Sequence, residues 1–250
     1  MKPIISIITV VFNRVKELEK TIKSVVSQEY PYIDYVVIDG GSTDGTIEVI
    51  KKYSDKISYW VSEKDNGIYD AMNKGLKIAK GDYVWFLNAG DEIYSENTLK
   101  NIFENSEDSD VYYGDTEYID ETGKSYGTRT LKKPPKKLDW KKFINGMVVS
   151  HQSMIIRKDK TVEYDLQYKH CADIDWAIRT FKNCKKITNT NSILSKFLIG
   201  GYSKKNIISS NKERYRILRK HFSLPSVWLS HFKLSFEFLK YYFTNKKKLY

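Results

Sequence analysis

The feature that most constrains this chain is an alternation of apolar runs and amphipathic segments over its first 99 residues. The runs are rich in β-branched residues, and each of the first three precedes a segment whose apolar residues recur every three or four positions. This order is typical of a doubly wound α/β fold with a mostly parallel sheet flanked by helices. The predicted strands cover about residues 4–11, 35–38, 57–62 and 83–87.

Polar side chains gather where these predicted strands end. In open α/β sheets, ligands bind beyond the carboxyl ends of the strands. Taken singly, most of these residues would be turn or helix-capping residues, and Asn13 is expected to cap the first helix. Together at one edge of one sheet they predict a shared binding cleft. They are Asn13, Asp39, Glu63, Asp65, Asn88 and Asp91.

After residue 99 the alternation changes, and a hairpin around residues 121–123 is expected. A strand at 151–158, a helix within ADIDWAIRTF and a strand at 196–203 follow. Two basic helices end the chain. We therefore predict a catalytic domain over residues 1–205, with halves 1–99 and 100–205, and a helical extension over 206–250.

The net charge of +11 is confined to that end of the chain. Residues 196–250 hold thirteen Lys and Arg against two Asp and Glu, so the rest of the chain is balanced. Such local basic density attracts anionic phospholipid or nucleic acid. Because no nucleic-acid reading module is recognisable, nucleic acid is not expected as a partner. The two cysteines, the lack of a signal pattern and the lack of a long apolar run predict a cytoplasmic protein.

Five segments in order carry a family resemblance: SIITVVFNR, VVIDGGSTDGT, DNGIYDAMNKG, FLNAGDE and ADIDWAIR. From about residue 4 to 200 the chain resembles glycosyltransferase family 2, the inverting, nucleotide-sugar-dependent enzymes of GT-A fold. It looks most similar to the branch that builds bacterial surface polysaccharides, the colanic-acid type. The resemblance implies transfer of a hexose or N-acetylhexosamine from a nucleotide sugar, with UDP expected, to a cell-surface glycan or lipid-linked acceptor.

The resemblance also assigns roles to the strand-end residues. Asp39 matches the carboxylate that accepts the uracil N3–H, and Asp65 matches a second nucleoside-binding acid. Val11, Asn13 and Arg14 match the segment that packs on base and ribose. Small residues before Asp91 would let the diphosphate approach the backbone; they are Asn88, Ala89 and Gly90.

Asp91 matches the last acid of the family's metal motif. Where many members have Asp-x-Asp-Asp, this chain reads Asn88-Ala89-Gly90-Asp91, so one carboxylate remains. A Mn²⁺ or Mg²⁺ ion held by one carboxylate takes its other oxygens from diphosphate and water. Metal dependence is therefore expected, with little metal held in the absence of nucleotide.

Asp173 matches the family's general base, which takes the proton of the acceptor hydroxyl. The Glu usual before it is Ala172 here. Asp175 is the alternative, but a spacing of two residues points to another side of a helix. Two further residues stay open. His151 either faces the diphosphate or acceptor or is a packed histidine, and Tyr202, in a Gly-Gly-Tyr-Ser segment, belongs either to a flap or to a turn.

The tail has two interpretations. Residues 226–244 form an amphipathic pattern with large apolar side chains, followed by Lys246–Lys248. This helix either packs on the catalytic domain or lies on an anionic membrane. Peripheral contact with the inner face of the cell membrane is favoured because a lipid-linked acceptor would lie there.

Three other functions compete with this interpretation. A non-catalytic nucleotide-sugar-binding module is the main alternative, because the acid motif is depleted. A nucleotidyltransferase would carry a Gly-rich loop in the first strand–helix turn, where this chain has Val11–Arg14. A basic membrane adaptor would depend entirely on the tail. The donor sugar, linkage and oligomeric state have no signal in the sequence.

Overall fold

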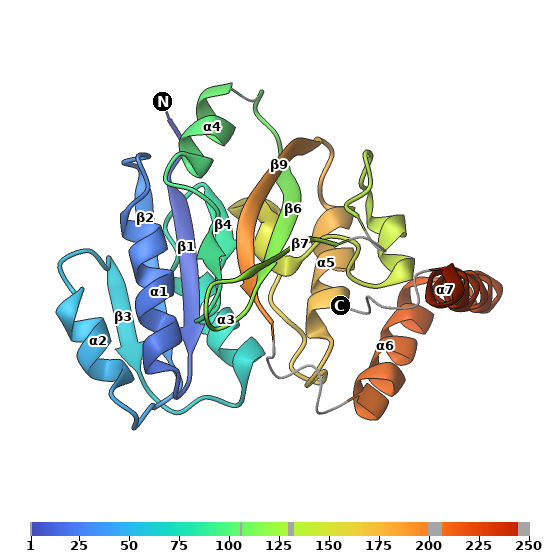
Figure 1. Cartoon of the computed structure of the whole chain (residues 1–250), viewed down its shortest axis with the longest axis horizontal. Helices are drawn as coiled ribbons and strands as arrows, with labels where there is room; N and C mark the ends of the chain where they lie inside the picture. The colour runs from blue at the N-terminus through green and yellow to red at the C-terminus, as the bar shows by residue number, and fades with distance from the viewer. Residues whose placement is uncertain (1, 106, 130–132, 200–206, 245–250) are drawn as a thin grey trace.

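The computed structural model describes residues 2–105, 107–129, 133–199 and 207–244. Its first half is the expected alternation of strands and helices, with bounds within a few residues of the prediction. Figure 1 shows this half on the left, with α1 in front of the sheet. The elements are β1 (Ile5–Val11), α1 (Val15–Val26), β2 (Ile33–Asp39), α2 (Thr46–Lys52), β3 (Tyr59–Ser62), α3 (Ile68–Ile78) and β4 (Tyr83–Phe86).

The second half contains the predicted hairpin, the strand near residue 155, the acidic helix and both terminal helices. The short strand β5 and the helix α4 had no counterpart in the prediction. The elements are β5 (Glu92–Ile93), α4 (Thr98–Asn105), β6 (Val111–Ile119), β7 (Ser125–Thr128), β8 (Met154–Arg157), α5 (Ala172–Lys182), β9 (Ile187–Leu198), α6 (Ile207–His221) and α7 (Leu224–Thr244), with 3₁₀ turns η1 (Trp140–Asn145), η2 (His151–Ser153) and η3 (Lys158–Lys160).

One sheet joins the two halves in the order β3-β2-β1-β4-β8-β6-β9-β5, and β7 pairs with β6. The strands β3, β2, β1 and β4 are parallel, as are β6 and β9; the remaining pairings are antiparallel. In this register Val11 at the end of β1 pairs with Asp39 at the end of β2. The carboxyl ends of the first strands therefore meet at one edge.

The apolar run of β1 is continuous because both faces of this strand are covered. Ile7 belongs to the core cluster that contains Leu18 of α1, whereas Ile8 belongs to the cluster that contains Met72 of α3. Successive side chains of a strand point to opposite faces, so the same run supplies both cores. Burial on both faces fixes the sheet against which the loops of the pocket are held.

The C-terminal helices lie at the end of the molecule opposite α2 and β3 (Figure 1). Ile217 and Leu218 of α6 and Val227 of α7 are fully buried in the core cluster that includes α5. On α7, Ser230 Oγ also donates to Ile144 O at 3.2 Å. One face of α7 thus packs on the domain, while Trp228 and neighbouring apolar residues face outward. The division into a catalytic domain over residues 1–205 and a helical extension over residues 206–250 stays a prediction.

The predicted role of Asn13 as a helix cap is wrong. Asn13 does not cap α1: Arg14 precedes that helix, and Asn13 has φ of 49° and accepts the Thr43 N–H at 2.8 Å. This hydrogen bond joins the loops after β1 and β2, and a short amide side chain tolerates the positive φ at this position.

Residues 200–206, including Tyr202 and the proposed flap, lie outside the described residues. Within the described ranges, no helix has the length and apolarity needed to cross a bilayer.

Candidate active site

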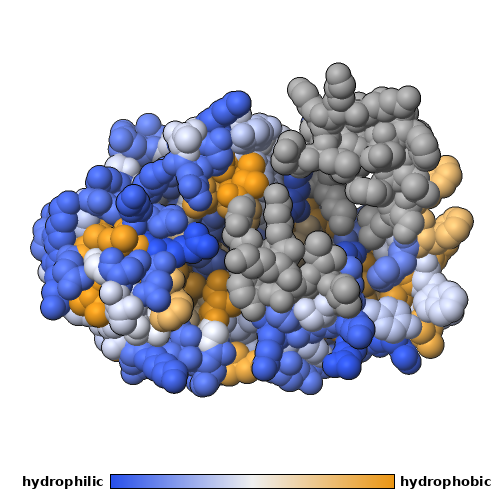
Figure 2. Space-filling view, turned by 60° about the horizontal axis from the view of Figure 1, so that its bottom comes forward, coloured by the Kyte–Doolittle hydropathy of each residue, from blue (hydrophilic) through white to orange (hydrophobic). Residues whose placement is uncertain are grey.

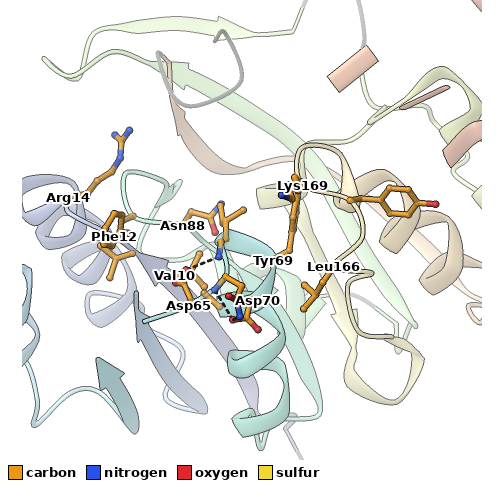
Figure 3. A pocket seen from close by; sticks show the side chains of 16 residues that line it. Val10, Phe12, Arg14, Asp65, Tyr69, Asp70, Asn88, Leu166 and Lys169 are labelled. Atoms are coloured by element: carbon orange, nitrogen blue, oxygen red, sulfur yellow. Dashed lines mark hydrogen bonds between the residues drawn. The ribbon is translucent and has the colours of Figure 1, made fainter. Parts of the chain in front are cut away.

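A cavity of about 550 Å³ opens at the carboxyl ends of β1 and β4. The start of α3 and the loop before α5 close its other side, as Figure 3 shows. Its walls combine backbone, aromatic and charged groups, as small-molecule sites do. The lining residues are Val10, Val11, Phe12, Arg14, Asp65, Asn66, Gly67, Ile68, Tyr69, Asp70, Ala71, Asn88, Ala89, Leu166, Tyr168 and Lys169.

Residues that follow β1 and β4 supply the strand-end wall. Phe12 presents its ring with 60% of the residue exposed, although large apolar side chains are usually covered. Arg14 extends away from the Asp65 carboxylate (Figure 3). The Ala89 N–H donates to Val10 O at 3.1 Å, which fixes the two strand ends side by side. Next to it, Asn88 Oδ1 is buried without a hydrogen-bond partner.

Asp65 lines this pocket, and its carboxylate lies against Gly40. Its Oδ1 accepts the Gly67 N–H at 2.8 Å. A Cβ atom on Gly40 would lie 2.4 Å from Asp65 Oδ2, well inside contact distance. The Asp-Gly-Gly sequence after β2 therefore leaves room for the Asp65 carboxylate at the pocket wall.

Asp39 is fully buried and does not line the pocket. Its Oδ1 accepts the Ser42 hydroxyl at 2.5 Å. Its Oδ2 accepts the Ser42 N–H at 3.0 Å, the Gly41 N–H at 3.1 Å and the Ser62 hydroxyl at 2.6 Å. Four internal donors make Asp39 the anchor of the turn after β2. Its predicted contact with uracil would require it to exchange one of these donors.

Asp91 also lies behind the pocket lining, with only 4% of the residue exposed. Burial raises the pKa of its carboxyl to about 7, although the Gln152 side chain and the Leu198 backbone N–H oppose this rise. Gly90 is held beside it, donating its N–H to Thr21 Oγ1 at 2.9 Å. Asp91, the predicted metal ligand, thus lies beside the end of β9 and not on the wall of the cavity.

The side chains of Asn88 and Asp91 offer oxygen ligands for a divalent cation. No cluster of three or more His, Cys, Asp or Glu side chains suited to a metal occurs among the described residues. The orphaned Asn88 Oδ1 is an oxygen acceptor at the pocket wall, and burial raises the pKa of the Asp91 carboxyl although the charge of Arg14 lowers it. Oxygen donors of this kind fit Mg²⁺ or Mn²⁺ if the remaining ligands come from diphosphate and water.

Asp173 lies at the start of α5, and the side chain of Tyr69 separates it from the cavity. The hydroxyl of Tyr69, a lining residue, donates to His170 O at 3.2 Å and lies 3.5 Å from Asp173 Oδ1. Burial raises the pKa of Asp173 to about 6, against the lowering effect of the Ile174 N–H that it accepts at 3.0 Å. A carboxylate with a pKa near neutrality is suited to act as a general base.

Asp175 faces away from the cavity and is fully buried. Arg179 Nε donates to its Oδ2 at 2.6 Å, and His221 Nε2 lies 2.8 Å from its Oδ1. Despite its burial, the hydrogen bonds from His221 and Arg179 lower the pKa of Asp175 to about 2. This arrangement suits a structural ion-pair network rather than a base.

His151 does not line the cavity either. Its Nε2 lies 2.6 Å from Tyr164 Oη, and its ring packs against Phe86 and Trp176. Burial lowers the pKa of His151 to about 4, so the imidazole is neutral at pH 7. These contacts are those of the packed histidine that the sequence left as one of two alternatives.

The structure therefore brings some predicted residues together and separates others. Lining residues that sequence reasoning missed lie in the loop before α5 and at the first turn of α3. Tyr69 had a signal, because it lies inside the recognised DNGIYDAMNKG segment; Leu166, Tyr168 and Lys169 had none. Of the predicted residues, the cavity is lined by Val11, Arg14, Asp65, Asn88 and Ala89, whereas Asn13, Asp39, Gly90, Asp91, His151, Asp173 and Asp175 do not line it.

Fold and pocket together define an α/β enzyme with a ligand site at the carboxyl edge of its parallel strands. The model of the family described as Glycosyl transferase family 2 matches residues 6–164. The chain belongs to this family, and the prediction that it is a family 2 glycosyltransferase is confirmed.

Two relatives of this chain are named as glycosyltransferases. An uncharacterized glycosyltransferase of Mycobacterium tuberculosis is 31% identical over 196 residues, which cover 74% of this chain and 72% of that protein. A PGL/p-HBAD biosynthesis glycosyltransferase of Mycobacterium bovis is 29% identical over 195 residues, covering 74% and 73%.

The fold matches solved glycosyltransferases. Residues 1–349 of Staphylococcus aureus TarS, crystallised with UDP-GlcNAc, align with a TM-score of 0.67 at 21% identity, covering 86% of this chain and 64% of that one. The mannosyltransferase PcManGT of Pyrobaculum calidifontis, in complex with GDP-Man and Mn²⁺, aligns with a TM-score of 0.59 at 13% identity, covering 98% and 83%. The predicted GT-A fold is therefore confirmed.

Proposed function

We propose that the chain is an inverting glycosyltransferase that moves a hexose or N-acetylhexosamine from a UDP-sugar to a bacterial cell-surface glycan or lipid-linked acceptor. The observation that carries this proposal is the composition of the cavity. One wall holds Phe12, Asp65 and Asn88 from the segments assigned to the nucleotide, and the opposite wall leads through Tyr69 to Asp173. Donor and base are thus expected on two sides of the same space.

In the proposed reaction, the acceptor hydroxyl oxygen attacks the anomeric carbon on the face opposite the diphosphate. A new carbon–oxygen bond forms as the bond to the diphosphate oxygen breaks, and the bonding pair leaves with the nucleotide. The hydroxyl proton passes to the Asp173 carboxylate. Asp175 is not available for this step because Arg179 and His221 occupy its oxygens. Inversion in one displacement needs no covalent intermediate on the protein.

A divalent cation fits this scheme at the corner formed by Asn88 and Asp91. Asp91 would hold it through its carboxylate, and Asn88 Oδ1 would gain the partner that it lacks. When bound, Mn²⁺ or Mg²⁺ supplies positive charge that stabilises the leaving diphosphate.

The names of similar proteins support the donor and the setting. TarS is described with UDP-GlcNAc, and PcManGT with GDP-Man and Mn²⁺. The mycobacterial relative is named for PGL/p-HBAD biosynthesis. From these names we propose a UDP-sugar donor and an acceptor of the cell envelope for this chain. Membership of the colanic-acid-type branch is also part of the proposal.

We further propose that α7 brings the enzyme to an anionic membrane from the cytoplasmic side. Trp228, Leu229, Phe232 and Phe236 are 67%, 70%, 76% and 63% exposed, and hydrophobic residues gather at that end of the molecule in Figure 2. Exposed aromatic and aliphatic side chains beside a strongly basic segment fit the headgroup region of an anionic bilayer. No nucleic-acid partner is proposed.

A donor panel tests the catalytic proposal. Purified chain is incubated with UDP- and GDP-sugars, Mn²⁺ and a glycan acceptor, and the anomeric configuration of the product is read by NMR. Transfer with inversion from a UDP-sugar is expected. Binding of a UDP-sugar with neither transfer nor slow hydrolysis across the panel would instead favour the non-catalytic binding module.

Vesicle sedimentation tests the membrane proposal. The full chain is expected to sediment with vesicles containing phosphatidylglycerol, more weakly with phosphatidylcholine alone, and a Phe232→Ser, Phe236→Ser variant is expected to remain in the supernatant. Transfer to a water-soluble acceptor is expected to continue in this variant. Unchanged sedimentation, or self-association through this face, would contradict the proposal.

A further inference from the structure

Glu213 lies on α6, outside the cavity, yet its carboxylate binds three consecutive backbone N–H groups. Its Oε1 accepts from Lys169 at 2.7 Å, and its Oε2 accepts from His170 and Cys171 at 2.7 Å each. Hydrogen bonds to an ionised carboxylate are about twice as strong as neutral ones. A single side chain of the C-terminal region thus fixes the three residues that precede α5.

These three residues connect the cavity wall to the start of α5. Lys169 lines the cavity, and His170 O accepts the Tyr69 hydroxyl at 3.2 Å. Cys171 is the residue directly before α5, and the Ile174 N–H donates to its carbonyl at 3.1 Å. The backbone held by Glu213 therefore sets where the first turn of α5, with Asp173, begins.

We propose that Glu213 is a positioning residue of the transfer reaction, holding Lys169–Cys171 so that Asp173 stands at the Tyr69 hydroxyl at the cavity wall. The inference rests on the proposed role of Asp173 as base. It extends the active-site support into α6, a helix assigned from the sequence to an extension beyond the catalytic domain. Geometric support of this kind matters because displacement of a reacting group by about 1 Å costs roughly a hundredfold in rate.

The charge of Glu213 also acts on the pKa of Asp173, an effect that a purely structural contact would not have. Among the described residues, ionisable groups that interact with Asp173 include Tyr69 from α3, Tyr164 and Cys171 from the segment before α5, and Glu213 from α6. Burial is the main reason that the pKa of Asp173 is raised, and the negative charge of Glu213 raises it further. Replacing that charge with an amide is expected to lower the pKa of Asp173.

The test compares Glu213→Gln and Glu213→Ala in the full chain, with Lys212→Ala as the matched control. Lys212 is the exposed neighbour on the same helix. UDP affinity, kcat and the pH dependence of kcat are measured with a water-soluble acceptor. We expect UDP affinity within twofold of wild type, a kcat lower by about tenfold to a hundredfold for Glu213→Ala and by less for Glu213→Gln, and an acid limb moved to lower pH in Glu213→Gln. Lys212→Ala is expected to match wild type in all three.

Wild-type kcat and an unmoved acid limb in both Glu213 variants would overturn the inference. Should Glu213→Ala fail to fold, Glu213→Gln keeps the side-chain length and one acceptor oxygen and carries the comparison alone. A wild-type chain that transfers no sugar would instead remove the proposed function, which separates the two failures.

Discussion

Asp175 of α5 and His221 at the end of α6 are joined by a 2.8 Å contact between Asp175 Oδ1 and His221 Nε2. The other carboxylate oxygen accepts from Arg179 Nε at 2.6 Å. Since Asp175 is fully buried, both oxygens depend on these partners for the interactions that water would otherwise supply. Asp175, the second acid of the ADIDWAIR segment, thereby fastens the end of α6 to α5.

Asp175→Asn is predicted to destabilise the protein, because removing one partner of a buried ion pair leaves the others uncompensated. A loss of about 3 kcal/mol in the free energy of unfolding is expected. For a chain of this size, that corresponds to a melting temperature lower by roughly 6–12 °C. Asp173→Asn is the matched comparison at pH 7. Its carboxyl has a raised pKa, so replacing it with a neutral amide is expected to preserve or increase stability.

The lowered pKa of Asp175 predicts how the stability of the protein depends on pH. The pKa of Asp175 is lowered to about 2 in the folded state, so its contribution is fully present above about pH 5 and is lost as the pH falls toward 2. Thermal melts of wild type and Asp175→Asn are therefore expected to converge in that range. Equal melting temperatures of the two proteins at pH 7 would contradict the assignment.

The pKa of Asp173, raised to about 6, predicts the acid limb of the reaction. As a base it must be deprotonated, so kcat is expected to rise about tenfold per pH unit below 6 and to level off above. Initial rates between pH 4.5 and 8.5 at saturating donor measure this limb. A rate that is flat through pH 6 would exclude Asp173 as the titrating base.

Gly40→Ala is predicted to weaken nucleotide binding through Asp65. The added Cβ would lie 2.4 Å from Asp65 Oδ2, so the carboxylate must move from the cavity wall. UDP affinity is expected to fall about tenfold, a loss of about 1.4 kcal/mol. A double-mutant cycle with Asp65→Ala isolates this path, because Gly40→Ala should cost little once the carboxylate is gone. Equal losses in both backgrounds would show another cause.

Asp91→Asn is predicted to remove the effect of metal on nucleotide binding. In wild type, Mn²⁺ is expected to tighten UDP binding measured by calorimetry; in Asp91→Asn the Kd with Mn²⁺ and with EDTA is expected to be equal. Asp173→Asn serves as the control and should retain the metal effect. Retention of the metal effect in Asp91→Asn would place the cation elsewhere.

Much of the fold could be predicted because apolar periodicity is local. The alternating runs of the first half gave β1 through β4, since a strand covered on both faces needs a continuous apolar sequence. The two-residue β5 is too short to produce a pattern. The pairing of β6 with β9 joins residues 76 to 79 positions apart, a partner choice that no local pattern encodes.

The site was predictable only in part, for a related reason. Asp65 and Asn88, chosen from their strand-end position, line the cavity, but strand-end position could not distinguish them from Asp39, which the turn after β2 uses for its own backbone. Glu213 could not be found from the sequence. Its partners are three backbone N–H groups about 43 residues earlier, and backbone groups leave no residue-specific signal.

The central claim is that Asp173 removes the acceptor proton beside a nucleotide-sugar pocket. It is tested most directly by the rate of sugar transfer from the preferred donor in Asp173→Asn, measured beside its affinity for UDP. The account predicts a rate at least about a hundredfold below wild type with UDP affinity unchanged within twofold. Transfer by Asp173→Asn at the wild-type rate would contradict it.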